Sequence, residues 1–176
     1  MTVRTAKFTD IPAILSMLEE MYEKSVYKGR DEIEPREARR LITTSLQRHG
    51  QMGPGGACVF VCGPEGAANG FIIGILDRIY HIGKKLMATD LYWYASDDAS
   101  RKDAIALFDT YCVWADTNPR VLEIKPGATD AVGDYRRTEI IFKRKGFRQC
   151  GSIWVRDAKG ADESGNIRKG AGQCQV

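Results

Sequence analysis

The residues best suited to chemistry stand where an expected strand gives way to an expected helix. Met87–Tyr94 alternate in the way of a strand, and their aromatic content favours a strand that is covered on both faces. From Arg101 to Ala115 the apolar residues recur at steps of three and four, which is typical of one face of a helix. The unpaired N–H groups and the dipole at such a helix start favour an anion beyond the end of the strand.

Three residues at the expected helix start suit that anion. Arg101 brings positive charge, and the small side chains of Ala104 and Ala106 allow a ligand to approach the backbone closely. The neighbouring Lys102 is either a further ligand or an exposed charge. A strand followed by an ordinary amphipathic helix has the same pattern, so these residues alone leave both interpretations open.

The composition indicates one globular domain. The 176 residues are 43% hydrophobic and 28% charged with a formal net charge of +3, which suffices for one core and indicates no committed nucleic-acid partner. Five cysteines without a close Cys-x-x-Cys pair predict reduced thiols and no metal site. No apolar run approaches the roughly 18 residues that cross a bilayer. We therefore predict a cytoplasmic protein with no membrane partner.

Periodicity and turn residues divide the rest of the chain into alternating elements. Pro and Gly mark most of the boundaries, as in the turn 63–66 and the connection 125–128. The patterns predict strands over residues 3–8, 57–62, 69–79, 87–94, 120–124 and 147–156, and helices over 11–22, 35–48, 101–115 and 134–145.

Three local motifs in this order resemble the GNAT N-acetyltransferase superfamily. Residues 101–106, Arg-x-x-Ala-x-Ala, are similar to the Arg/Gln-x-x-Gly-x-Gly/Ala signature that holds the pyrophosphate of acetyl-coenzyme A. Residues 141–147 resemble the Phe-Tyr-x-x-x-Gly-Phe end of the last helix of the superfamily, and residues 3–11 are similar to its first strand and helix cap. The chain thus looks like a phage or bacterial member.

The resemblance implies an α/β (α+β) domain over residues 1–157. Its sheet would be mixed and mostly antiparallel, with six to seven strands flanked by about four helices. Residues 158–176 are Gly-rich, charged and without period, which predicts a flexible tail.

The resemblance also implies an enzyme that moves an acetyl group from acetyl-coenzyme A, its co-substrate, to an amine by direct attack. Asp90 would take the proton of the amine, unless it faces solvent or pairs with a cation. The N–H of Tyr94 or Ala95, left unpaired by a strand bulge, would stabilise the oxyanion. The cofactor-binding segment comprises Arg101, Lys102, Asp103, Ala104, Ile105 and Ala106.

Two departures from the pattern of the superfamily bear on activity. Phe142 stands where many members have a tyrosine that protonates the departing thiolate, and Tyr135, two helical turns earlier, is a weak substitute. Asp97 and Asp98 would also lie near the pyrophosphate, and we expect them to point away from it because like charges repel.

The sequence leaves the acceptor open. In the superfamily the loop between the first two helices shapes the acceptor site, which makes Tyr27 and Arg30 candidates, although a solvated loop would contain the same residues. Tyr92 is either a wall of that site or part of the core. The amine would belong to a small molecule, a protein or a nucleobase.

Two other functions remain open, as does a homodimer. Phage DNA-modification proteins of the Mom type also look GNAT-like. A nucleic-acid substrate would suit the basic segments 84–85, 136–137 and 143–145 together with Arg148, although solvated helix faces explain them equally well. A catalytically inactive binding protein of the same fold would explain Phe142 and Ala104.

Overall fold

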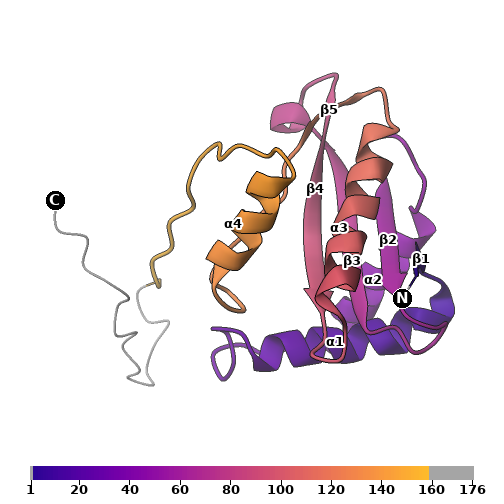
Figure 1. The fold of residues 1–176 in the computed structure, drawn as a ribbon, viewed down its shortest axis with the longest axis vertical. Coiled ribbons are helices and arrows are strands. Elements are labelled where there is room, and N and C mark those ends of the chain that lie inside the picture. Colours follow the sequence, from indigo (N-terminus) through magenta and orange to yellow (C-terminus); the bar gives the residue numbers. More distant parts are fainter. Residues whose placement is uncertain (1, 159–176) are drawn as a thin grey trace, which may run out of the picture.

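The structure, a computed structural model, describes residues 2–158 of the chain, and the predicted tail lies almost wholly outside them. Five strands form one sheet in the order β1-β2-β3-β4-β5 (Figure 1). Neighbouring strands are antiparallel except β4 and β5, which are parallel. The strands are β1 (Val3–Thr5), β2 (Ala57–Cys62), β3 (Gly70–Arg78), β4 (Leu86–Ala95) and β5 (Val121–Ile124).

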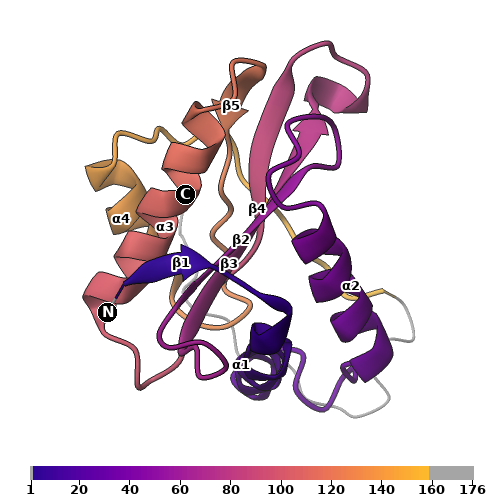
Figure 2. The same ribbon diagram turned by 90° about the vertical axis from the view of Figure 1, so that its right-hand side faces the viewer.

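Four α-helices cover the two faces of the sheet (Figure 2). Helices α1 and α2 pack on one face, and α3 and α4 lie on the other. Each face has its own cluster of buried apolar side chains. The helices are α1 (Ile11–Glu23), α2 (Pro35–Gln47), α3 (Arg101–Asp116) and α4 (Tyr135–Arg144), with short 3-10 helices at Phe8–Asp10 and Ile79–His81.

The predicted sheet of six to seven strands is wrong in number, since the described residues contain five. The missing strand is the one expected over residues 147–156, which have no regular structure. Gly146, with φ +83°, ends α4 as predicted, but the chain beyond it meets no strand edge with which to pair. Ile153, Trp154 and Val155 consequently stay exposed.

A β-bulge divides β4 into two halves. Gly74 of β3 lies opposite Asp90 and Ile73 lies opposite Tyr92, so Leu91 is an extra residue on β4. The bulge shifts the alternation of side chains by one position. Ala88 therefore belongs to the cluster under α3 before the bulge and Trp93 joins that cluster after it, while Tyr92 packs toward α1.

Strands β4 and β5 run together only at their beginnings. Their parallel pairing covers Leu86 to Ala88 of β4, and the last contact is a hydrogen bond from Lys125 N to Ala88 O at 2.8 Å. Beyond Ala88, no described strand pairs with this side of β4. The second half of the strand, including the bulge, therefore has an open edge.

Gly74 lets α3 approach the sheet opposite the bulge. A Cβ at this position would lie 2.5 Å from Cε2 of Tyr111 and 2.9 Å from Sγ of Cys58, and both of these side chains are fully buried. We expect Gly74→Ala to lower the free energy of unfolding by about 1–3 kcal/mol, because an overpacked core must shift. Denaturant titration measures this change. Gly53→Ala, which meets nothing within 4 Å, is the control, and equal stability of the two variants would contradict the close packing.

Candidate functional site

A cavity of about 560 Å³ opens beside the bulge of β4. Its floor is the segment Asp90–Trp93, and its walls come from α1, the loop between α1 and α2, the first half of α2 and the connection that follows β5. The side chains from the two helices are apolar except for the hydroxyl of Tyr22: Leu18, Met21, Tyr22, Ala38 and Leu41. The cavity therefore joins the open edge of β4 to the α1–α2 loop, the two places where the sequence predicts chemistry.

Asp90 is half-buried at the bulge, and its carboxylate is not neutralised by a cation. Its Oδ1 accepts a hydrogen bond from Gly127 N at 2.8 Å. No lysine, arginine or histidine in the described part of the chain forms an ion pair with it. Burial raises the pKa of Asp90, although the hydrogen bond from Gly127 opposes that rise. The carboxylate is thus a stronger base than an exposed one.

Along the second half of β4, every other backbone N–H group points toward the open edge of the sheet. Ser96 N donates to Asn69 O at 2.9 Å, which fixes the alternation along the antiparallel ladder with β3. By this alternation the N–H of Tyr94 points toward β3, whereas those of Trp93 and Ala95 point toward the open edge. The geometry therefore favours Ala95 over Tyr94 as a backbone donor, and it adds Trp93, which the sequence did not indicate.

The first turn of α3 presents positive charge to solvent, while the N–H groups of Asp103 and Ala104 donate to Ser100 O at 3.0 and 3.2 Å. Ser100 caps the helix, because its side chain accepts a hydrogen bond from Asp103 N at 3.1 Å. The side chains of Arg101 and Lys102 are exposed, and those of Ala104, Ile105 and Ala106 are half-buried. The carboxylate of Asp103 is buried and accepts the Ser100 hydroxyl at 2.7 Å, and its N–H donates to Ser100, so its predicted contact with a ligand has no support from this geometry.

The acidic loop before α3 does not crowd the helix start. Asp97 is exposed and pairs with Lys24 at the end of α1, with an N···O distance of 3.0 Å. Asp98 is also exposed. Both carboxylates are therefore solvated or paired, as a site for an anion at α3 requires.

Aromatic side chains fill the space between β4, α3 and α4. The ring of Phe142 lies 5.2 Å from that of Phe108 and 6.2 Å from that of Trp93. The indole N–H of Trp93 donates to Ala104 O at 2.9 Å, which ties β4 to the first turn of α3. Tyr135 lies at the other end of α4, is 38% exposed and does not line the cavity. Its predicted role as a proton donor has no support from this geometry.

Two of the three predicted acceptor residues line the cavity. Tyr27 and Tyr92 do so, but Arg30 does not, and its guanidinium pairs with Asp157 at 2.7 Å. Several other residues that line the cavity carry no motif in the sequence. Asp31 and Glu32 lie in the same polar loop as Tyr27, so their place near Tyr27 follows from the sequence. The residues after β5 reach the cavity only through the tertiary fold: Gly127, Thr129, Ala131 and Val132.

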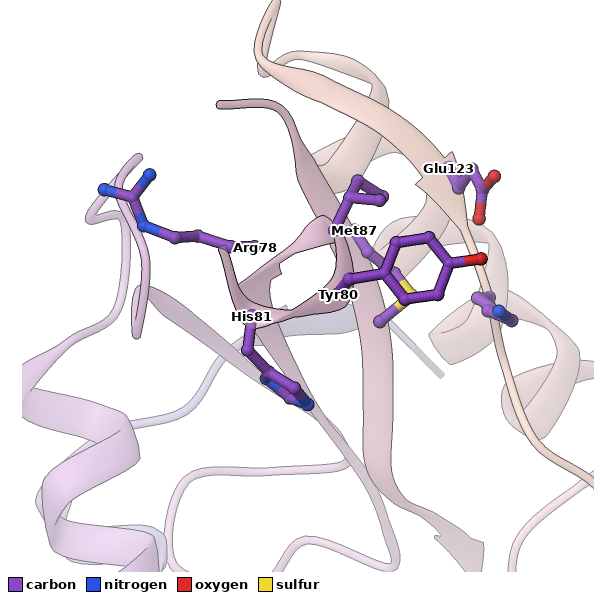
Figure 3. A pocket seen from close by; sticks show the side chains of 7 residues that line it. Arg78, Tyr80, His81, Met87 and Glu123 are labelled. Atoms are coloured by element: carbon purple, nitrogen blue, oxygen red, sulfur yellow. The ribbon is translucent and has the colours of Figure 1, made fainter. Parts of the chain in front are cut away.

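A second cavity, of about 300 Å³, lies at the far end of the sheet by the β3–β4 connection (Figure 3). Tyr80 extends across Met87, while the side chains of Arg78 and His81 point away from one another. His81 pairs with Asp77, with an N···O distance of 2.6 Å. Because its charged groups do not converge, this cavity offers no evident chemistry.

Within residues 2–158 there is no group of three or more potential metal ligands. No helix in that range combines the length and apolarity that spanning a membrane requires. Cys58 and Cys62 are buried with free thiols.

No protein-family model and no curated protein matches the sequence. Solved structures match it over most of its length. An acetyltransferase from Trypanosoma brucei has a TM-score of 0.63 at 12% identity and covers 89% of this chain and 99% of its own. A ribosomal-protein-alanine N-acetyltransferase from Brucella melitensis has a TM-score of 0.60 at 15% identity and covers 90% and 100%.

A third match is AAC(6')-Iy in complex with the bisubstrate analogue CoA-S-monomethyl-acetylneamine. Its TM-score is 0.62 at 14% identity, with 89% of this chain and 97% of that chain covered. The chain therefore has the GNAT fold.

Proposed function

We propose that this protein is an N-acetyltransferase that moves an acetyl group from acetyl-coenzyme A to an amine by direct attack. The observation that carries the proposal is the meeting, at one bulge, of an open strand edge, a half-buried carboxylate and a cavity. Solved structures of the same fold that are named acetyltransferases support it.

The residues present suit acetyl-coenzyme A. Arg101, Lys102 and the N–H groups at the start of α3 would hold its pyrophosphate, because both the charges and the helix dipole favour an anion there. The open edge of β4 would pair with the amides of the pantetheine arm in the way that a sheet edge pairs with an added strand. Bound acetyl-coenzyme A would supply an activated thioester.

The residues of the cavity would perform the proton and charge steps. Asp90 would take a proton from the amine, since its raised pKa makes it a better base than an exposed carboxylate. The N–H of Ala95 or Trp93 would stabilise the negative charge that develops on the carbonyl oxygen. Phe142 has no proton to give, and Tyr135 lies away from the cavity, so water would protonate the thiolate.

Calorimetric titration of acetyl-coenzyme A into the protein, followed by a thiol-release assay with a panel of amines, tests the proposal. We expect saturable binding, and free thiol only when an amine is present. A protein that shows no binding would contradict the proposal. Binding without thiol release for any amine would instead support the catalytically inactive binding protein, which the phenylalanine at position 142 favours.

A further inference from the structure

The cavity beside β4 carries negative charge that nothing in the described part of the chain neutralises. Asp90 lies at its floor, and Asp31 and Glu32 lie exposed at its mouth. Its lining contains no lysine, arginine or histidine. None of the three carboxylates forms an ion pair with a described residue. An uncompensated acidic cavity attracts cations and repels anions.

The loop that bears the two outer carboxylates is held in place. The Tyr22 hydroxyl donates to the backbone carbonyl of Asp31 and accepts a hydrogen bond from Gly29 N. Asp31 Oδ1 in turn accepts a hydrogen bond from Glu32 N at 2.8 Å. The two carboxylates therefore lie on an ordered turn, so binding a cation there would cost little conformational entropy of this loop.

The remaining walls suit a chain of methylene groups. Tyr22, Tyr27 and Tyr92 contribute aromatic rings, which attract ammonium groups as well as apolar ones. Leu18, Met21, Ala38 and Leu41 are purely apolar. The volume of about 560 Å³ is in the range of small-molecule sites. A nucleic acid would bring phosphates toward three carboxylates, so this wall disfavours DNA-base modification.

We propose that the acceptor is a small linear diamine or polyamine, with one amine at Asp90 and a second, still protonated, at Asp31 and Glu32. This inference rests on the proposed acetyl transfer. In that step a C–N bond forms to the acetyl carbon, the C–S bond breaks and its electron pair leaves with sulfur. The acceptor ammonium first gives one proton to Asp90, the neutral amine then attacks, and the nitrogen loses a second proton after the C–N bond forms. In net terms one proton ends on the thiol sulfur and one in solvent. The outer ammonium keeps its charge throughout.

Initial rates with linear diamines and with primary monoamines of the same carbon number test the proposal. We expect kcat/KM to be about tenfold or more higher for the diamine, and this advantage to fall with added salt. In Asp31→Asn/Glu32→Gln the diamine should lose most of its advantage through KM, while the monoamine should change little. The matched control is Glu19→Gln/Asp116→Asn, which removes two exposed carboxylates outside the cavity.

The outcomes separate this inference from the proposed function. If thiol release is intact but kcat/KM is equal for the diamine and the monoamine, the preference for a diamine acceptor is wrong and the proposed acetyl transfer still holds. Calorimetry with diaminobutane gives a readout without turnover. If the double variant binds diaminobutane more weakly and the control variant binds it normally, Asp31 and Glu32 form the diamine site. This result would stand even if no thiol is released, whereas the absence of thiol release would overturn the proposed acetyl transfer. A double variant that binds diaminobutane as the parent protein does would overturn the inference.

Discussion

The Asp90→Asn variant is expected to lose roughly 10²–10⁴-fold in kcat/KM for acetyl transfer, the usual contribution of a positioned general base. Asparagine keeps an oxygen for the hydrogen bond from Gly127 N, and its size is almost unchanged. It cannot accept a proton from the amine. Steady-state assays of thiol release measure the loss, and titration of acetyl-coenzyme A should show unchanged affinity. Near-normal turnover would remove Asp90 from the mechanism.

The pH profile gives the same prediction a second readout. Because burial raises the pKa of Asp90, the parent protein should gain activity as pH rises through that raised value, where the carboxylate becomes the free base. The Asp90→Asn variant should lack this rise. A rise that persists in the variant would show that another group titrates.

The stability of the variant should change in the opposite direction to its activity. A raised pKa in the folded protein means that the ionised carboxylate is less favourable there than in the unfolded chain. This cost begins as pH rises above the unfolded value of about 3.9 and is complete above the folded pKa. Asp90→Asn should therefore be more stable than the parent protein at neutral pH and equally stable at acid pH. Thermal melts at both pH values test this, and a variant that is less stable at neutral pH would indicate a structural role.

Arg101→Glu is expected to weaken acetyl-coenzyme A binding by about tenfold to more than a hundredfold. A hydrogen bond to a charged group contributes about 1.5–3 kcal/mol, and the reversed charge would add repulsion of the pyrophosphate. Arg101 is exposed at the start of α3, so the fold should tolerate the substitution. Titration calorimetry measures the affinity.

Arg39→Glu is the matched control for Arg101→Glu. It makes the same change in net charge on the exposed side of α2, far along the chain from α3. If both variants lost affinity for acetyl-coenzyme A equally, the effect would come from overall charge, and the proposed pyrophosphate site at the start of α3 would be wrong. Arg101→Lys should retain part of the binding, because it keeps the charge and loses the forked geometry of the guanidinium.

Local patterns in the sequence were sufficient to predict most of the fold and to indicate two parts of the candidate site. The start of α3 follows from the change of period at Arg101, and the buried setting of Asp90 follows from its apolar and aromatic neighbours. Both signals lie within one segment. The predicted strand over residues 147–156 failed for a related reason, since a strand needs a partner edge and local composition does not supply one.

The rest of the site depends on how separate segments meet. Nothing near Gly127 indicates that its N–H reaches Asp90, because that contact depends on where β5 leaves β4. The helical spacing correctly put Tyr135 and Phe142 on one helix, but it could not show which end of α4 meets the sheet. Tertiary geometry therefore decided which of the predicted residues reached the cavity.

The bulge at Leu91 constrains how the length of this chain can vary. The side chain of Leu91 is 40% exposed, so its identity is weakly constrained by packing. Its presence is a stricter requirement, because a one-residue deletion at this point would restore regular alternation along β4. Tyr92 and Trp93 would keep Ile73 and Ile72 as their partners and stay on their present faces, so the deletion would remove only the bulge beside Asp90. Substitutions at this position should be common among homologues, and deletions should be selected against.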